Sequence, residues 1–391
     1  MAELSFTVGA LTECFPGEQR VSVTPKSITR LATHGVKVLV EAGAGAGAFI
    51  SDDEFAASGA EVCSRQRIIA DAAVITCIRP PSPEVLAAMH SGQFLVGMLH
   101  TTSDKSLAKT LNTRSIVGID LALLPRTMSN AQSMDAMTSQ DSVAGYKAVI
   151  VAAGLFGRYL PMMITAAGTS RPTTLVVLGA GVAGLQAIAT ARRLGADVTG
   201  YDIRPECRSE IESLGARFLE LAGDISSTTS DGYARSLTTE EQDAQQKAMD
   251  TALDAFDIVI TTARVPGHRP PTLVTTAAID GMRPGSVVLD MAASSLGGNV
   301  EGSVPDTTTH TAHGVSIIGA GNLAATVSSA ASDAYARNIA DVIAHFVRDD
   351  QLDIDPDDPI DAAIVVGRGH ADRPQKNSAQ QTPAMANGIA S

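Results

Sequence analysis

No apolar run in this sequence is long enough to cross a membrane, and aromatic residues are scarce. Trp is absent, and aromatic residues make up only 4% of the 391 residues, although 45% of all residues are hydrophobic. Small aliphatic side chains must therefore fill the core, as they do in α/β folds with buried parallel strands. The most apolar stretch, residues 148–157, falls short of the roughly 20 residues that a membrane-spanning helix needs. We expect no direct membrane insertion.

Patterns for metal binding, disulfides and export are also missing. The four cysteines lie far apart with no Cys-x-x-Cys pair, and the eight histidines form no His-Glu-x-x-His pattern. These absences argue against a metal site and against a disulfide framework. The N-terminus has no basic segment followed by an apolar run, so it does not resemble a signal peptide. A net charge of −13 argues against nucleic acid and anionic membranes as ligands. We expect a cytoplasmic protein with reduced thiols.

The most informative pattern that is present is a glycine-rich turn between a predicted strand and a predicted helix. The strand covers residues 173–178, the helix extends to residue 194, and Asp202 ends the next apolar run. Strand, turn, helix, strand and acid at this spacing are typical of a dinucleotide-binding unit. N–H groups at the start of the helix can bind phosphates, and the second glycine lets the backbone approach them. The turn consists of Gly179, Ala180, Gly181, Val182, Ala183 and Gly184.

Two successive series of strands and helices predict an α/β fold of two Rossmann-like, doubly wound domains with parallel sheets, linked by long helices. Strands are expected at residues 36–40, 72–77, 94–99 and 115–121, and again at 173–178, 198–201, 217–221, 258–262, 287–289 and 315–318. Long helices are expected at residues 141–167 and 324–346, followed by a strand at 362–366. We therefore predict an N-terminal domain of residues 1–138 plus 325–367, a dinucleotide-binding domain of residues 139–324, and a disordered tail of residues 368–391.

Three further patterns have simpler structural explanations. A second glycine-rich run at residues 42–47 also follows a strand, but Ser51 three residues before Glu54 looks like the start of a separate helix. We expect a tight turn there and no phosphate site. The acidic residues 355–359 are interrupted by prolines, which favours a solvated turn over a metal site. His310 and His313 are expected in a loop.

Several segments resemble the family of soluble NAD(H)-binding alpha subunits (domain I) of proton-translocating NAD(P) transhydrogenases. Residues 20–25 match a segment that this family shares with alanine dehydrogenase. The resemblance covers almost the whole chain up to about residue 366. The segments that carry it are residues 131–135, 139–140, 143–149, 178–189, 231–234, 261–263, 266–267 and 297–299.

The resemblance implies an activity that needs other subunits. Two α/β domains would form each protomer, the protomers would form a homodimer, and NADH would bind in the cleft at the second domain. Hydride would pass directly between NADH and NADP⁺ bound on a partner subunit, in a reaction of the Si-specific/Re-specific type. A separate membrane subunit would couple this transfer to proton translocation. The chain would be peripheral to the inner or plasma membrane through these partners.

The resemblance also implies roles for individual residues. Asp202, followed by Ile203 and Arg204, would bind the adenosine ribose and favour NAD over NADP. Gln132, Ser133 and Asp135, with Arg126, would hold the nicotinamide and its ribose and so orient the ring for hydride transfer. Gly232 and Tyr233 would belong to a mobile loop that closes over the nucleotide. Weaker matches in the nucleotide site are Gln245, Thr262, Ala263 and Arg264.

The sequence departs from the family pattern at two places. One extra residue separates Arg126 from Gln132, and Asn130 replaces a second arginine. Arg264 stands where an apolar residue is usual, next to the expected adenine pocket. Both departures bear on residues of the expected nucleotide site.

Two other functions compete with the transhydrogenase hypothesis. An NAD-dependent amino-acid dehydrogenase of the alanine dehydrogenase type would use Arg20 and His100, which match that family's positions. Its catalytic lysine, however, aligns with Arg79, and its catalytic aspartate aligns with Ser294. Arginine cannot readily move a proton, because its pKa exceeds about 12. A non-catalytic NAD(H)-binding protein is the other alternative, although it would have no need of a loop that orients the nicotinamide.

Overall fold

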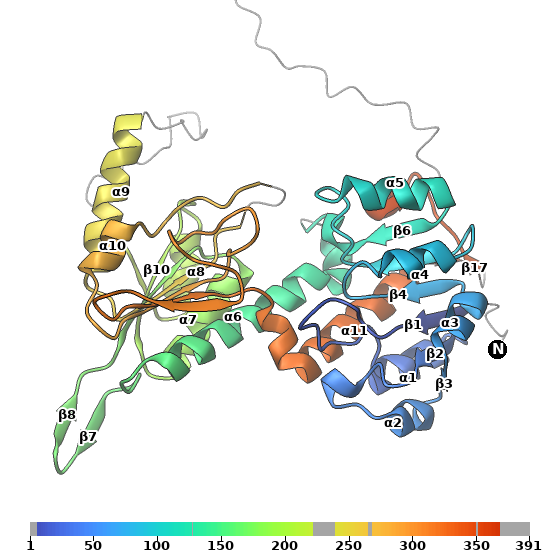
Figure 1. The fold of residues 1–391 in the computed structure, drawn as a ribbon, viewed down its shortest axis with the longest axis horizontal. Helices are drawn as coiled ribbons and strands as arrows, with labels where there is room; N and C mark the ends of the chain where they lie inside the picture. The colour runs from blue at the N-terminus through green and yellow to red at the C-terminus, as the bar shows by residue number, and fades with distance from the viewer. Residues whose placement is uncertain (1–5, 127, 222–238, 265–267, 349–350, 368–391) are drawn as a thin grey trace, which may run out of the picture.

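Two α/β units, each built on its own sheet, make up the protein (Figure 1). The computed structural model describes residues 6–126, 128–221, 239–264, 268–348 and 351–367. Within this part of the chain, each of the two large sheets has seven strands. We call the units the first and the second unit, in the order in which their sheets begin along the chain.

The sheet of the first unit is parallel except at one edge. Its order is β18-β6-β5-β4-β1-β2-β3, and the edge strand β18 pairs antiparallel with β6. Buried aliphatic side chains cover both faces, which is why these strands are apolar throughout. The strands are β1 (Thr7–Ala10), β2 (Lys37–Glu41), β3 (Glu61–Cys63), β4 (Val74–Thr76), β5 (Phe94–Gly97), β6 (Val117–Asp120) and β18 (Val365–Gly367). The helices are α1 (Pro25–Thr33), α2 (Asp52–Ala57), α3 (Arg65–Asp71), α4 (Pro83–Ala88) and α5 (Lys105–Arg114).

The sheet of the second unit has the order β11-β10-β9-β12-β13-β15-β14. From β9 the chain first moves outward to β10 and β11, then returns to β12 on the other side, so the strand order reverses between β9 and β12. Ligands of open parallel sheets bind at such a point, beyond the carboxyl ends of the strands. The strands are β9 (Thr174–Leu178), β10 (Asp197–Tyr201), β11 (Arg217–Phe218), β12 (Ile258–Thr261), β13 (Val287–Asp290), β14 (Thr307–His310) and β15 (Ser316–Gly319). The helices are α7 (Val182–Arg193), α8 (Cys207–Ser213), α9 (Thr239–Leu253) and α10 (Thr276–Gly281).

Two long helices join the units (Figure 1). Helix α6 (Ala136–Leu155) starts in the core of the first unit with Ala136 and continues into the core of the second with Ala148 and Ala152. Helix α11 (Ser328–Phe346) returns the chain to the first unit, where the hydroxyl of Tyr335 donates to the carbonyl of Cys77 at 2.7 Å. Both helices are therefore part of a hydrophobic core at the same time as they connect the sheets.

Some predicted elements differ in the structure. The helix predicted at residues 141–167 ends at Leu155, and β7 (Met163–Thr165) and β8 (Gly168–Ser170) form a hairpin beyond it. Gly157 and Pro161 follow that helix end closely, and neither residue type favours a continued helix.

Near the end of the described chain, Asp358 caps a helix, α12 (Pro359–Ile364), so the strand predicted at 362–366 starts only at Val365. The helix predicted from residue 324 starts only at Ser328, because a short 3₁₀ turn, η4 (Leu323–Val327), precedes α11. His310, expected in a loop, lies on β14.

Candidate functional site

The three glycines of the turn after β9 differ in whether the surrounding protein leaves room for a side chain. A Cβ atom at Gly184 would lie 1.8 Å from the carbonyl oxygen of Gly179, so helix and turn can pack only without it. Gly179 has a φ of +103°, and a Cβ there would meet the hydroxyl of Thr262. Gly181 has an ordinary φ of −75°, and a Cβ there would have no atom within 4 Å. Nothing in the protein itself requires Gly181, so the space beside it is available to a ligand.

The helix that follows the turn offers its backbone N–H groups at the same place. Helix α7 begins at Val182, and its N-cap is Gly181, which has no side chain to accept a hydrogen bond. The N–H groups of a first helical turn have no partner inside the helix, and the helix dipole makes this end positive. An open backbone position in front of an uncapped helix fits a phosphate group.

Asp202 lies beside this turn at the end of β10. One carboxylate oxygen accepts a hydrogen bond from the N–H of Ala180 at 2.8 Å, and Arg204 donates to both oxygens, at 3.0 and 3.1 Å. Burial alone would raise the pKa of Asp202, but the hydrogen bonds from Arg204 and Ala180 outweigh it and lower the pKa below its usual value. The side chain of Ile203 is largely exposed. The acid is therefore ionised and fixed next to the glycine turn.

The loop that carries Gln132 and Asp135 lies at the start of α6. Gln132 and Ser133 are exposed on a short 3₁₀ turn, η3 (Ser129–Met134). Asp135 is buried and caps α6, because its carboxylate accepts hydrogen bonds from the N–H and the hydroxyl of Thr138, at 2.8 and 2.6 Å. Arg126 Nε lies 3.8 Å from a carboxylate oxygen of Asp135, so the extra residue before Gln132 does not separate the two.

The remaining predicted contacts are partly structural. The hydroxyl of Thr262 donates to the carbonyl of Gly179 at 3.0 Å, and the amide of Asn299 donates to the carbonyl of Ala263 at 2.9 Å. Gln245 donates to the hydroxyl of Tyr201 at 3.1 Å from α9. The first of these bonds holds the end of β12 against the turn, and the other two join neighbouring segments. Gly232 and Tyr233 lie outside the described residues.

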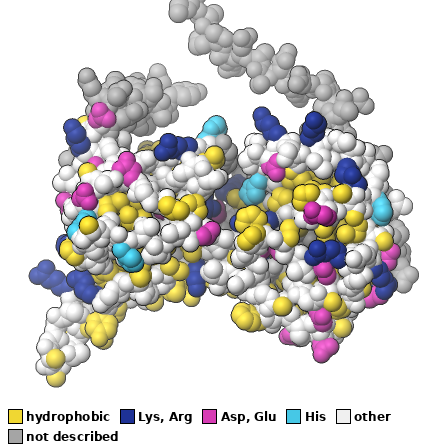
Figure 2. Space-filling model, viewed as in Figure 1, with side chains coloured by type: hydrophobic (Ala, Val, Ile, Leu, Met, Phe, Trp, Pro, Cys, Tyr) yellow, Lys and Arg dark blue, Asp and Glu magenta, His cyan; other side chains and the backbone are white. Residues whose placement is uncertain are grey.

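A group of charged residues that the sequence spacing did not reveal lies between the units. Asp141 of α6 is 4.0 Å from Arg126 of the first unit and 4.0 Å from Arg264 of the second. His100, at the end of β5, has a φ of +51°, and its N–H donates to the carboxylate of Asp120 at 3.1 Å. Figure 2 shows Lys and Arg side chains in the hollow between the two units. Only the tertiary structure brings together residues this far apart in the sequence.

The residues that match alanine dehydrogenase positions have other partners here. Arg20 is buried and donates to Glu18 at 2.7 and 2.6 Å and to Gln140 at 2.7 Å. Although burial opposes it, Arg20 lowers the pKa of Glu18. The guanidinium of Arg79 stacks on the ring of Phe15, with its central carbon 4.1 Å from the ring centroid. The hydroxyl of Ser294 donates to the carbonyl of Gly297 at 3.0 Å, so it closes a turn.

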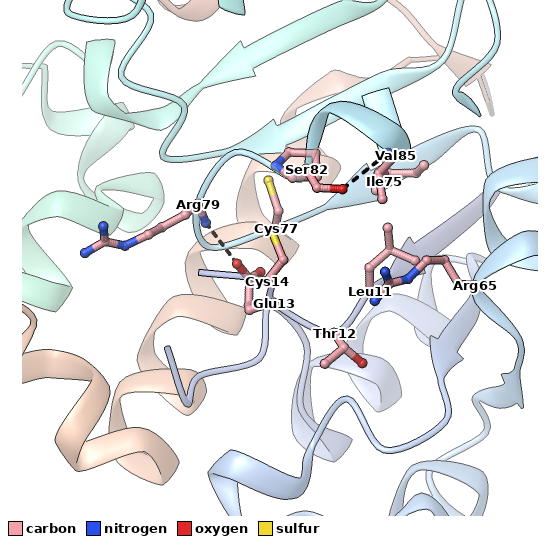
Figure 3. A pocket seen from close by; sticks show the side chains of 11 residues that line it. Leu11, Thr12, Glu13, Cys14, Arg65, Ile75, Cys77, Arg79, Ser82 and Val85 are labelled. Atoms are coloured by element: carbon pink, nitrogen blue, oxygen red, sulfur yellow. Dashed lines mark hydrogen bonds between the residues drawn. The ribbon is translucent and has the colours of Figure 1, made fainter. Parts of the chain in front are cut away.

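A separate cavity lies inside the first unit, next to Arg79 (Figure 3). Glu13 is held there by the N–H groups of Ile78 and Arg79, at 2.6 and 3.2 Å from its two carboxylate oxygens. Burial raises the pKa of Glu13 to about 7. The sulfur-bearing side chains of Cys14 and Cys77 also line this cavity, but no residue of the glycine turn does. The cavity is therefore distinct from the predicted nucleotide site.

Among the described residues, one group has ligand atoms close enough together for a metal ion. It consists of His345, Asp358 and Asp361. Arg348, however, donates to Asp361 at 3.2 Å, and His345 Nε2 lies 2.6 Å from the same carboxylate. The arginine supplies the positive charge that this buried carboxylate needs, so the group acts as an ion-paired anchor. In the same stretches of the chain, no helix is both long and apolar enough to span a bilayer.

Comparison with known proteins gives consistent matches over nearly the whole chain. The family model for the alanine dehydrogenase/PNT N-terminal domain matches residues 9–144, and the model for the C-terminal domain matches residues 148–373. A protein of Rickettsia prowazekii (strain Madrid E), named as the first portion of NAD(P) transhydrogenase subunit alpha, is 39% identical over 353 residues. The match covers 88% of this chain and 91% of that protein.

Two solved structures have the same architecture. The transhydrogenase from Sinorhizobium meliloti has a TM-score of 0.83 at 37% identity and covers 93% of this chain and 99% of that one. An L-alanine dehydrogenase has a TM-score of 0.71 at 26% identity, covering 86% of this chain and 88% of that one. The resemblance in sequence therefore extends to the three-dimensional fold, and it is greater for the transhydrogenase.

Proposed function

Because this chain belongs to the alanine dehydrogenase/PNT family, we propose that it is the NAD(H)-binding component of a proton-translocating NAD(P) transhydrogenase. It binds NADH and presents it for direct hydride transfer to NADP⁺ on a partner subunit, with Si-specific/Re-specific geometry. A separate membrane subunit couples the transfer to proton movement. The observation that carries the proposal is the open position at Gly181, in front of an uncapped helix and beside the ionised Asp202.

The surroundings of Asp202 support NAD(H) as the cofactor. A carboxylate at the adenosine ribose accepts hydrogen bonds from its hydroxyls and repels the 2′-phosphate of NADP. An arginine next to the acid could reverse this preference by binding that phosphate. Here Arg204 donates to both oxygens of Asp202 through Nε and Nη2, so this edge of its guanidinium is already engaged by the acid. The pair favours a ribose without a phosphate.

The loop at the start of α6 supports a role in orienting the nicotinamide. NADH supplies the hydride when it is bound, and the protein contributes position and electrostatics. Gln132 offers an exposed amide that can bond the carboxamide of the ring. Asp135 is held rigidly by Thr138, and Arg126 lies beside it. Holding the ring at one angle contributes to rate because the two reacting atoms must meet at a fixed distance. We propose that Tyr233 and Gly232 close over the nucleotide.

We propose a homodimer as the form of this subunit. The hairpin of β7 and β8 projects from the second unit (Figure 1). Its residue Ile164 is 72% exposed. Tyr159 and Met162, just before it, are also largely exposed. Apolar side chains gathered on an arm of this kind mark an interaction surface. A second copy of the chain would cover them, and the membrane and NADP(H)-binding subunits would be bound elsewhere.

One observation keeps amino-acid dehydrogenation as a second candidate. His100 follows β5, and burial lowers its pKa; Asp120 opposes this shift, whereas the charges of Arg79 and Arg264 add to it. A histidine near cationic groups could serve a small carboxylate substrate. The neutral Ser294 and the permanently charged Arg79, at the positions of that enzyme's catalytic acid and base, favour the first proposal.

The test uses the purified chain with and without a transhydrogenase subunit that binds NADP(H). We expect NADH binding by the chain alone, and hydride transfer from NADH to an NADP⁺ analogue only when that subunit is added. Alanine with NAD⁺ is the parallel assay. Reduction of NAD⁺ by alanine, without transfer to the NADP⁺ analogue, would replace the proposal with the second candidate.

A variant pair tests the nucleotide site itself. Asp202→Ala should weaken NADH binding by roughly 1–3 kcal/mol, because charge-assisted hydrogen bonds to the ribose are lost. Asp197→Ala removes an acid from the same strand, β10, where it pairs with Arg217 at 2.8 Å. That control should leave NADH affinity unchanged. Equal NADH affinity of the two variants would show that Asp202 does not contribute to the nucleotide site.

A further inference from the structure

Hydrogen bonds hold one edge of the Arg264 guanidinium, and the other edge makes none with the described residues. Its Nε donates to the carbonyl of Met291 at 2.9 Å, and Nη2 donates to the same oxygen. Among the described residues, Nη1 makes no hydrogen bond, and an oxygen of Asp141 lies 4.0 Å away. The side chain is 49% exposed. An arginine anchored in this way presents its remaining donors in one direction.

The position of Arg264 places those donors near the glycine turn. The two preceding residues, Thr262 and Ala263, pack directly against Gly179. Gly145 of α6 packs on Ala183 of the same turn, where a Cβ at Gly145 would lie 2.1 Å from the carbonyl oxygen. Asp141 is one helical turn before Gly145, on the same face of α6. Arg264 and Asp141 therefore both belong to segments that contact the turn, and their side chains lie 4.0 Å apart.

Asp141 lies near two arginines but accepts no hydrogen bond from either of them. Its carboxylate oxygens are 4.0 Å from Arg126 and 4.0 Å from Arg264, which is too far for a hydrogen bond. Its side chain is 26% exposed, so the charges act through a partly buried region where they are weakly screened. The other nearby acid, Asp135, already bonds Thr138 through both oxygens. The two guanidiniums face two carboxylates, so the charges balance, but Nη1 of Arg264 still lacks a hydrogen-bond acceptor among the described residues.

We propose that Arg264 binds the pyrophosphate of the dinucleotide, and that Asp141 is the positioning residue that holds Arg264 toward it. The proposal rests on the function proposed above and extends it to a cation that the family pattern lacks at this position. The phosphate would lie at the N-terminus of α7 and accept hydrogen bonds from Nη1. Because Asp141 acts by charge alone, the donors of Arg264 remain available to the phosphate.

The experiment compares ligands with and without phosphate on Arg264→Leu. ADP and NADH should bind about tenfold more weakly than to the unaltered chain, as expected when one charge-assisted contact is lost. Adenosine, which has no phosphate, should bind equally well. Arg264→Lys keeps the charge and should recover part of the loss. Arg217→Leu, on β11 where Arg217 pairs with Asp197, is the matched control and should change nothing. Isothermal titration calorimetry gives all affinities, and circular dichroism confirms folding.

Asp141 is tested by its dependence on Arg264. Asp141→Asn should weaken ADP and NADH binding about threefold to fivefold, Asp141→Glu should restore most of it, and Asp141→Asn should have no further effect in the Arg264→Leu background. An equal loss for adenosine and ADP in Arg264→Leu would overturn the proposal, as would unchanged ADP affinity. Failure of the unaltered chain to bind NADH would instead contradict the proposed function.

Discussion

Each unit has a glycine-rich turn after a strand, and the two turns use their glycines differently. In the first unit the turn is closed by its own chain: a Cβ at Gly45 would lie 2.5 Å from the carbonyl oxygen of Ile50, and one at Gly47 would lie 2.7 Å from that of Gln19. In the second unit a Cβ at Gly181 would meet nothing. Close packing of the chain requires Gly45 and Gly47, whereas the ordinary φ and open space at Gly181, in front of an uncapped helix, leave room for a ligand.

The helices after the two turns differ in the same way. Helix α2 is capped by its own sequence, because the N–H of Glu54 donates to the hydroxyl of Ser51 at 3.2 Å and the N–H of Ser51 donates to the carboxylate of Glu54 at 2.8 Å. Helix α7 has no side-chain cap. The cap therefore satisfies one N–H group in the first turn of α2, whereas the first turn of α7 receives no such bond.

The largest effect is expected where the second turn packs against α6. Gly145→Ala should lower the free energy of unfolding by about 2–3 kcal/mol, because its Cβ would overlap the backbone of Ala183. Gly154→Ala on the same helix is the matched control. It has nothing within 4 Å, so it should raise the free energy of unfolding by about 0.5–1 kcal/mol. Urea denaturation measures both, and equal stability of the two variants would show that α6 and α7 do not need this contact.

The second prediction concerns the pH dependence of stability in the two units. Burial raises the pKa of Glu13 to about 7, so the folded first unit keeps a proton that the unfolded chain releases near pH 4.5. Stability from this group is present below pH 4.5 and is lost as pH rises toward 7, by on the order of 2 kcal/mol. The lowered pKa of Asp202 acts in the opposite direction, since its contribution is lost only as pH falls into the acid range.

Urea unfolding at pH 5 and pH 8 separates these contributions. The difference between the two pH values should be smaller in Glu13→Gln than in the unaltered chain, since the variant has no group to titrate. Asp202→Asn should leave this difference unchanged. An identical pH dependence in Glu13→Gln and the unaltered chain would exclude Glu13 as its source.

The third prediction replaces one glycine of each turn by alanine. Gly181→Ala should weaken NADH binding at least tenfold, about 1.4 kcal/mol, because its methyl group would occupy the phosphate position. The free energy of unfolding of the Gly181→Ala variant should change by less than about 0.5 kcal/mol. Gly47→Ala should do the reverse, losing about 1 kcal/mol or more of stability while its folded form binds NADH normally. Calorimetric titration and thermal unfolding distinguish the two outcomes, and a loss of binding in both variants would contradict the comparison.

The smallest effect is expected at the cap of α2. Ser51→Ala removes the hydroxyl that accepts from Glu54 and should cost about 1 kcal/mol of stability. NADH affinity should not change, because this helix has no role at the nucleotide site. Thermal unfolding with a parallel NADH titration checks both statements. A change near zero in the free energy of unfolding would mean that the Ser51 cap does not stabilise α2, and so is no real difference between α2 and α7.

Local patterns predicted much of the fold. The strand, glycine turn and helix around Gly181 form as expected, and so does the cap at Ser51, because each depends on neighbouring residues and short-range hydrogen bonds. The helix end at Leu155 was missed because helical periodicity continues past it while Gly157 and Pro161 end the helix. The strand expected at 362–366 begins late because Asp358 caps a helix first. The domain boundaries remain predictions.

The sequence by itself determined where the glycine turn between β9 and α7 lies, since residue types at fixed spacing dictate that local geometry. It also placed Asp202 at the end of the following strand. Only the tertiary structure decided which glycine has open space beside it and which arginines lie near Asp141. Asp141, Arg126 and Arg264 come from three separate segments, and their meeting depends on how α6 joins the units. Spacing along a chain cannot show such a contact, because packing of the two cores sets the distances.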